Sequence, residues 1–216
     1  MNTATRRIVS TLGVIFGISG ISHGFFEVLQ GNTPTGGMFI SAIGETHRMW
    51  EHGNEYAFTL VPNFLITGIL AMGVAVAIIV WSIRFVHKKN GPLVFLLLFI
   101  LLFLVGGGVA QVLFFTLTWA VATRINKPLT WWRKAIPERL RMVLAKLWPW
   151  SLAFGSLLML LTLEIATTGF VPFVSDSESI LTIMLSSLAV ALGAFLLTFV
   201  AGFAHDIERQ SRGVGR

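Results

Sequence analysis

Residues 92–123 form an uninterrupted apolar run without a single charged side chain. One α-helix of these 32 residues would be about 48 Å long, whereas the hydrocarbon core of a bilayer is about 30 Å thick. The run also contains Gly106-Gly107-Gly108 at its middle, where helix propensity is lowest and the chain turns most easily. We therefore expect residues 92–123 to form a hairpin that turns at Gly106–Gly108.

Other apolar runs place the chain among multi-pass membrane proteins. The chain is 55% apolar and 12% charged, and this is about half the charged fraction of a soluble domain. This composition excludes a soluble globular domain and a nucleic-acid-binding protein, despite the formal net charge of +6. The prediction is an all-α polytopic membrane helix bundle with five to six hydrophobic segments, near residues 8–29, 57–84, 92–105, 109–123, 149–170 and 180–204.

The distribution of basic residues supports the hairpin. Cytoplasmic loops of membrane proteins are enriched in Lys and Arg. A single crossing of residues 92–123 would divide the 16 Lys and Arg residues into groups of five and eleven on the two faces. A hairpin divides them into fifteen and one, with only Arg48 outside. This distribution predicts a protein of the cytoplasmic (inner) membrane with both termini in the cytoplasm.

The segments between the apolar runs suggest one membrane domain over residues 1–216. We expect a polar outer loop at 30–56, a basic inner loop at 124–148 and a polar cytoplasmic tail at 205–216. The first apolar run is too long for a signal peptide and lacks a small-residue cleavage site, so we expect a retained helix. No cysteine is present, which excludes disulfides and thiolate metal sites.

The basic inner loop has the pattern of an amphipathic helix. Pro137 suits the first turn of a helix, and basic residues alternate with an apolar face made of Leu140, Val143, Leu144 and Leu147. Such a helix lies on the membrane surface and binds anionic lipid headgroups. The alternative is a docking site for a partner protein.

Polar side chains from four apolar segments fall at a similar depth. His23, Asn63 and Glu164 each lie about six residues from the outer end of a segment, roughly 9 Å by the helical rise. Gln111 lies just past the hairpin tip. An ionisable group at this depth costs several kcal/mol unless it faces the interior and finds partners. We therefore expect these four side chains to meet in one pocket in the outer leaflet.

The glycine spacing in the first apolar run predicts that two candidate site residues point into the bundle. Gly13, Gly17, Gly20 and Gly24 form a stripe of small residues, the pattern that lets membrane helices approach closely. His23 and Glu27 flank this stripe, so both should point into the bundle.

Imidazole and carboxylate side chains concentrate in one stretch of the chain. Three of the five histidines fall between residues 23 and 55, together with Glu27, Glu45, Glu51 and Glu55. Such ligands suit a divalent metal, either zinc, iron, manganese or copper, and the candidate ligands are His23, Glu27, His47, Glu51 and His52. No known metal-binding motif is present, since His47 to His52 read H-x3-E-H. The alternative is a hydrogen-bonded pair that only fixes helix packing, beside an ordinary solvated loop.

Three functional hypotheses remain open. In the first, a membrane enzyme or ligand-binding protein uses His23 and Glu164 in catalysis and Asn63 and Gln111 in binding. In the second, a small transporter or channel subunit uses His23, Gln111 and Glu164 as a proton or substrate relay. In the third, the chain is an accessory subunit without chemistry of its own. The sequence indicates neither a substrate nor an oligomeric state.

Overall fold

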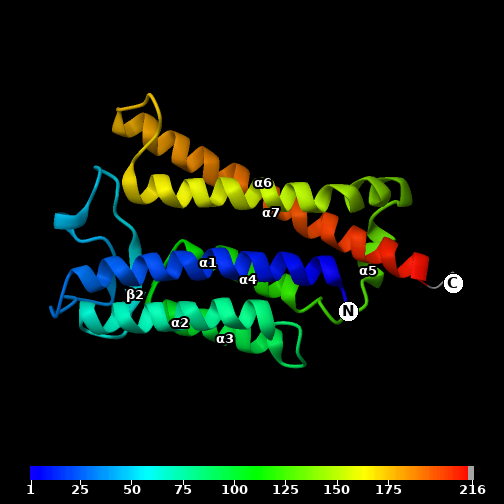
Figure 1. Cartoon of the computed structure of the whole chain (residues 1–216), viewed down its shortest axis with the longest axis horizontal. Helices are drawn as coiled ribbons and strands as arrows, with labels where there is room; N and C mark the ends of the chain where they lie inside the picture. The colour runs from blue at the N-terminus through cyan, green and yellow to red at the C-terminus, as the bar shows by residue number, and fades with distance from the viewer. Residues whose placement is uncertain (214–216) are drawn as a thin grey trace.

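The structure is a computed structural model that describes the chain over residues 1–213, with side chains described through Ser211. Four helices are long and apolar enough to cross a membrane. They are α1 (Thr3–Leu29), α2 (Phe64–Arg84), α6 (Glu138–Thr168) and α7 (Ser177–Gly213). The predicted all-α membrane bundle is therefore confirmed, and Figure 1 shows its helices running along one common direction.

The two ends of the bundle differ in charge. One end holds the start of α1, the α2–α3 turn, the chain after α4 and the last turns of α7 (Figure 1). Hydrogen bonds tie these segments together, because Asn2 donates to the carbonyl groups of Arg124 and Ile125 and Asp206 accepts from Ala4 and Thr5. We call this the basic end, because every described Lys and Arg except Arg48 lies there. We call the opposite end the loop end. Which end faces the cytoplasm stays a prediction.

The hairpin predicted for residues 92–123 is confirmed. It consists of α3 (Gly91–Leu104), a short strand β3 (Val105–Gly108) and α4 (Gln111–Ala122). With 14 and 12 residues, the two helices are about 21 and 18 Å long, too short to cross a bilayer. The chain therefore reverses part of the way through the bundle and returns to the basic end.

The glycine segment is not a loop but the third strand of a small sheet. Strands β1 (Phe39–Ser41) and β2 (Tyr56–Thr59) come from the polar loop at the loop end, where η1 (Glu45–His47) also lies. The antiparallel order is β1-β2-β3, with Ala57 opposite Gly108 and Phe58 opposite Gly107. The sequence analysis predicted no sheet and assigned residues 57–63 to the second apolar segment, although α2 begins only at Phe64.

The predicted glycine stripe of α1 packs against α2. Gly13 faces Ser82, Gly17 faces Ile79, and Gly24 lies against the backbone of Gly68. Because a methyl group at any of these positions would overlap with its neighbour, the two helices can approach this closely only with glycine there.

Helices α6 and α7 pack along each other as a second unit above α1 (Figure 1). The sequence analysis placed residues 124–148 in an inner loop, but only α5 (Thr130–Ala135) and the adjoining turns fit that description. Helix α6 begins at Glu138 and continues through Pro149. Arg141, expected on the polar face of a surface helix, is buried and pairs with Glu208 of α7 at 2.5 Å.

Helix α6 continues through its internal proline because a side chain of α7 supplies a hydrogen-bond donor in place of the N–H that proline lacks. Pro149 has no N–H, so the carbonyl group of Ala145 loses its helical partner. The Nδ1 atom of His205 lies 3.2 Å from this carbonyl oxygen and can donate to it as Nδ1–H. The ring of His205 also packs against Trp148, with ring centroids 5.5 Å apart.

We expect His205→Phe to destabilise the protein by about 1–2 kcal/mol, because it leaves the Ala145 carbonyl oxygen without a donor. The measurement is thermal unfolding in detergent, with His47→Phe as the matched control, since the one hydrogen bond of the His47 side chain among the described residues is to the neighbouring Thr46 in the loop. Equal stability of the two variants would show that the Ala145 carbonyl does not need this donor.

Candidate functional site

Two buried ionisable side chains of α1 lie in its last two turns. His23 is 5% exposed and Glu27 is 0% exposed, so the predicted inward orientation of both residues is confirmed. His23 Nε2 lies 2.5 Å from Glu55 Oε2, in the segment that leads into β2. Burial by itself would raise the pKa of the Glu55 carboxyl group, but the charge and hydrogen bond of His23 hold this pKa below its ordinary value. Glu55 is therefore an ionised carboxylate at neutral pH.

Strand β3 lies directly against these two residues of α1. A Cβ atom at Gly106 would overlap with the Glu27 carboxylate, and a Cβ atom at Gly108 would overlap with the His23 ring. Gly106 also has φ +112, a conformation that L side chains rarely adopt. The glycines therefore allow the chain to turn and also leave the space that His23 and Glu27 occupy.

Gln111 joins the site from the first turn of α4. Its Nε2 atom donates to Ser19 Oγ at 2.9 Å, and both residues are buried. Ser19 lies four residues before His23, on the same face of α1. The structure thus brings together His23, Glu27 and Gln111 of the predicted residues, and it adds Ser19 and Glu55.

A cavity of about 260 Å³ adjoins this polar group. It lies between α1 and α4 on one side and α6 and α7 on the other, toward the loop end. Its polar end is formed by Ser19, Asn54, Glu55 and Gln111, together with His52. Its walls are apolar and include Phe16, Phe114, Met159, Leu163, Met184, Leu185 and Leu188.

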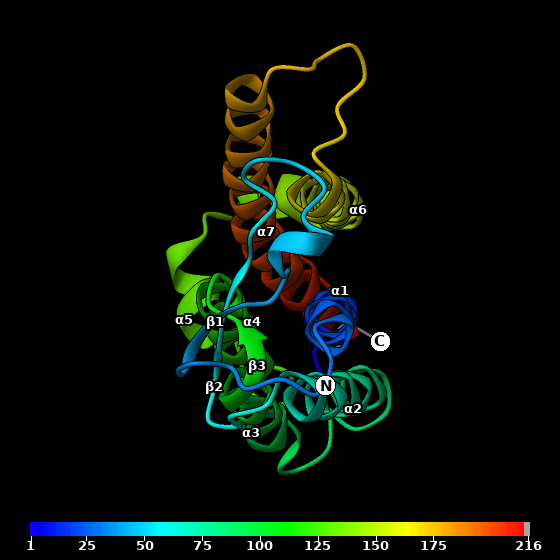
Figure 2. The same ribbon diagram turned by 90° about the vertical axis from the view of Figure 1, so that its left-hand side faces the viewer.

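The loop between β1 and β2 bridges the two halves of the bundle beside this cavity. Trp50 Nε1 donates to the carbonyl group of Ala166 in α6 at 3.0 Å. His52 Nε2 lies 3.1 Å from Glu178 Oε1, in the first turn of α7. Figure 2 shows this loop extending from the sheet toward α6 and α7. His52 and Glu55 thus approach the cavity from outside the helices.

Two predicted residues do not reach the site. Asn63 caps the start of α2, where its side chain accepts from Ile66 N–H and donates to Asn32. It therefore precedes the first helical residue of α2. Glu164 lies on the exposed face of α6, where its carboxylate accepts from Thr168. Its helical phase turns it away from the cavity, which neighbouring Leu163 lines.

The predicted metal ligands are dispersed. His47 and Glu51 remain in the loop, and His52 is engaged with Glu178. Over the described residues, no group of three or more His, Cys, Asp or Glu side chains has an arrangement that could hold a metal ion. The metal-site prediction thus has no support from the geometry.

Glu55 is the functional candidate that the sequence analysis did not assign. It was one of four acids counted in the stretch, but nothing in its spacing indicates that β2 would pair with β3 and bring it to His23. Comparisons with protein-family models, curated proteins and solved structures give no match for this chain.

We expect Gly106→Ala to destabilise the protein by about 1–3 kcal/mol, because it combines a strained backbone with overpacking against Glu27. Thermal unfolding in detergent measures the change. The matched control is Gly73→Ala in α2, where a Cβ atom meets no other atom within 4 Å. Similar stability for both variants would contradict the close packing of β3 on α1.

Proposed function

We propose that this membrane protein binds a small amphiphilic molecule in the cavity between its two halves. The observation that carries the proposal is the composition of the cavity, which has apolar walls and one polar end at Ser19, Glu55 and Gln111. Ligand pockets are usually apolar with a few polar groups that fix the orientation of the ligand. A volume of about 260 Å³ lies just below the usual range of roughly 300–1,000 Å³, which favours a small ligand.

The charge of Glu55 indicates the polar group of this ligand. An ionised carboxylate only accepts hydrogen bonds, so the ligand should carry a hydroxyl or amine donor. His23 holds the other side of the carboxylate and fixes its orientation.

A pair of probes that differ by one hydroxyl group tests this proposal. We expect 4-ethylphenol to bind the purified protein in detergent about tenfold or more tightly than ethylbenzene, because only the phenol donates to Glu55. Glu55→Gln should remove most of this preference. Binding is measured by saturation-transfer NMR and by the rise in melting temperature.

Two tryptophan variants locate the binding site. Leu188→Trp fills the cavity and should abolish saturable binding. Leu160→Trp adds the same volume on the exposed face of α6, outside the cavity lining, and should leave binding unchanged. Equal affinities for the two probes, or full binding by Leu188→Trp, would overturn the proposal.

A second candidate function is proton transfer, and two unpaired groups favour it. Both carboxylate oxygens of Glu27 and the Nδ1 atom of His23 are buried without a hydrogen-bond partner among the described residues. They lie one helical turn apart, and the His23–Glu55 pair connects them to the cavity. Burying a polar group without a hydrogen-bond partner destabilises the folded state, so a structural role alone does not account for Glu27.

Proton uptake into proteoliposomes tests this second function. With an applied membrane potential and a pH-sensitive dye inside, the wild-type protein should acidify the lumen faster than Glu27→Gln. Glu164→Gln is the control, because this carboxylate lies on the exposed face of α6, and it should match the wild type. Rates equal to those of protein-free vesicles would exclude proton transfer.

A further inference from the structure

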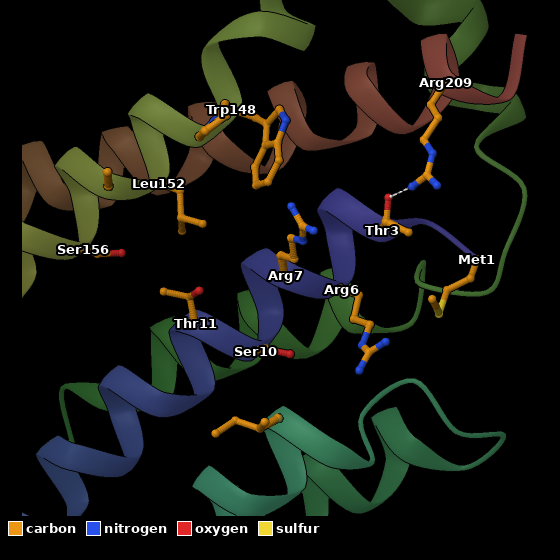
Figure 3. Close-up of a pocket in the computed structure, with 13 residues that line it drawn as sticks. Met1, Thr3, Arg6, Arg7, Ser10, Thr11, Trp148, Leu152, Ser156 and Arg209 are labelled. Atoms are coloured by element: carbon orange, nitrogen blue, oxygen red, sulfur yellow. Dashed lines mark hydrogen bonds between the residues drawn. The ribbon is translucent and has the colours of Figure 1, made fainter. Parts of the chain in front are cut away.

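A second and larger cavity lies at the basic end. It has a volume of about 870 Å³ and runs along α1, between the end of α2 and the first half of the membrane-spanning part of α6. Figure 3 shows Arg7 reaching from α1 toward Trp148 of α6, while Arg209 of α7 donates to Thr3 at the same end. We call this the arginine groove.

The chemistry of the arginine groove changes along its length. Arg6, Arg7 and Arg209 lie at its outer end, and among the residues that the structure describes no carboxylate lines it. Deeper in the groove the lining is apolar at Ile83, Leu152 and Ala153. A cationic end joined to an apolar side is complementary to a phospholipid, whose phosphate precedes its acyl chains.

The arginines, and not the helix terminus, supply the positive charge. The first amide groups of α1 already donate to Asp206, through Ala4 at 3.0 Å and Thr5 at 2.9 Å. Arg7 has no ion pair or side-chain hydrogen bond within the described residues, so its guanidinium group is available for a ligand. A guanidinium group fits a phosphate with two parallel hydrogen bonds.

We propose that the arginine groove binds one anionic phospholipid. Arg7 and Arg209 hold its phosphate, and one acyl chain lies along Ile83 and Leu152. Apart from Trp148, the groove uses no residue of the 124–148 segment for which surface binding of lipid headgroups is predicted. It also does not depend on the function proposed for the cavity at the loop end.

Native mass spectrometry of the delipidated protein in detergent tests the site. We expect one dioleoylphosphatidylglycerol to bind about tenfold or more tightly than dioleoylphosphatidylcholine. Arg7→Gln should weaken binding of the phosphatidylglycerol about tenfold and should remove most of its preference over the phosphatidylcholine, whose choline cation already offsets the phosphate charge. Arg7 has few contacts to lose, so this variant should fold, and its unfolding temperature without lipid serves as the check.

The matched control is Lys88→Gln, which removes one exposed charge at the same end but outside the groove. It should bind phosphatidylglycerol like the wild type. If Arg7→Gln and Lys88→Gln lose the same affinity for phosphatidylglycerol, general charge attraction explains the binding, and the proposed site is wrong. Competition by glycerol phosphate at concentrations similar to those of the lipid would assign the groove to a soluble phosphate ester instead.

Discussion

The constraint on which the rest of this structure depends is the hydrogen bonding of a chain reversal inside an apolar layer. Away from water, backbone N–H and C=O groups need partners from the protein itself. Residues 105–109 obtain theirs from β2 and its neighbours, where Val109 N–H donates to Tyr56 and Leu60 N–H donates to Leu104. Thr67 of α2 adds a hydrogen bond to the Val105 carbonyl group at 2.7 Å. The re-entrant hairpin therefore requires the small sheet, which supplies hydrogen-bond partners for the backbone of the turn.

This requirement also builds the candidate site. To pair with β3, the strand β2 must enter the bundle, and it brings the neighbouring Glu55 to His23. The absence of side chains at Gly106 and Gly108 lets β3 lie on α1 at the level of Glu27 and His23. One set of backbone hydrogen bonds therefore explains the strand, the glycines and the position of the carboxylate.

The second half of the bundle completes both cavities. Helices α6 and α7 contribute the apolar wall at the loop end and, with α1, the arginine groove at the basic end. Two interactions join α6 to α7. His205 can donate to the carbonyl group that Pro149 leaves without a helical partner, and Arg141 forms an ion pair with Glu208. Both interactions join residues about 60 positions apart in the chain, so neither was visible in the local pattern of apolar and basic residues.

The sequence by itself determined the membrane class, the helical bundle, the hairpin at residues 92–123 and the burial of His23 and Glu27. Length, charge distribution and glycine spacing are sufficient for these conclusions, because bilayer thickness and helix geometry limit the possibilities so strongly. Only the tertiary structure decided that Glu55 meets His23, that Glu164 turns outward and that Asn63 caps a helix. Depth along a helix can be counted from the sequence, but strand pairing and helical phase depend on which surfaces pack together, and these contacts join residues far apart in the chain.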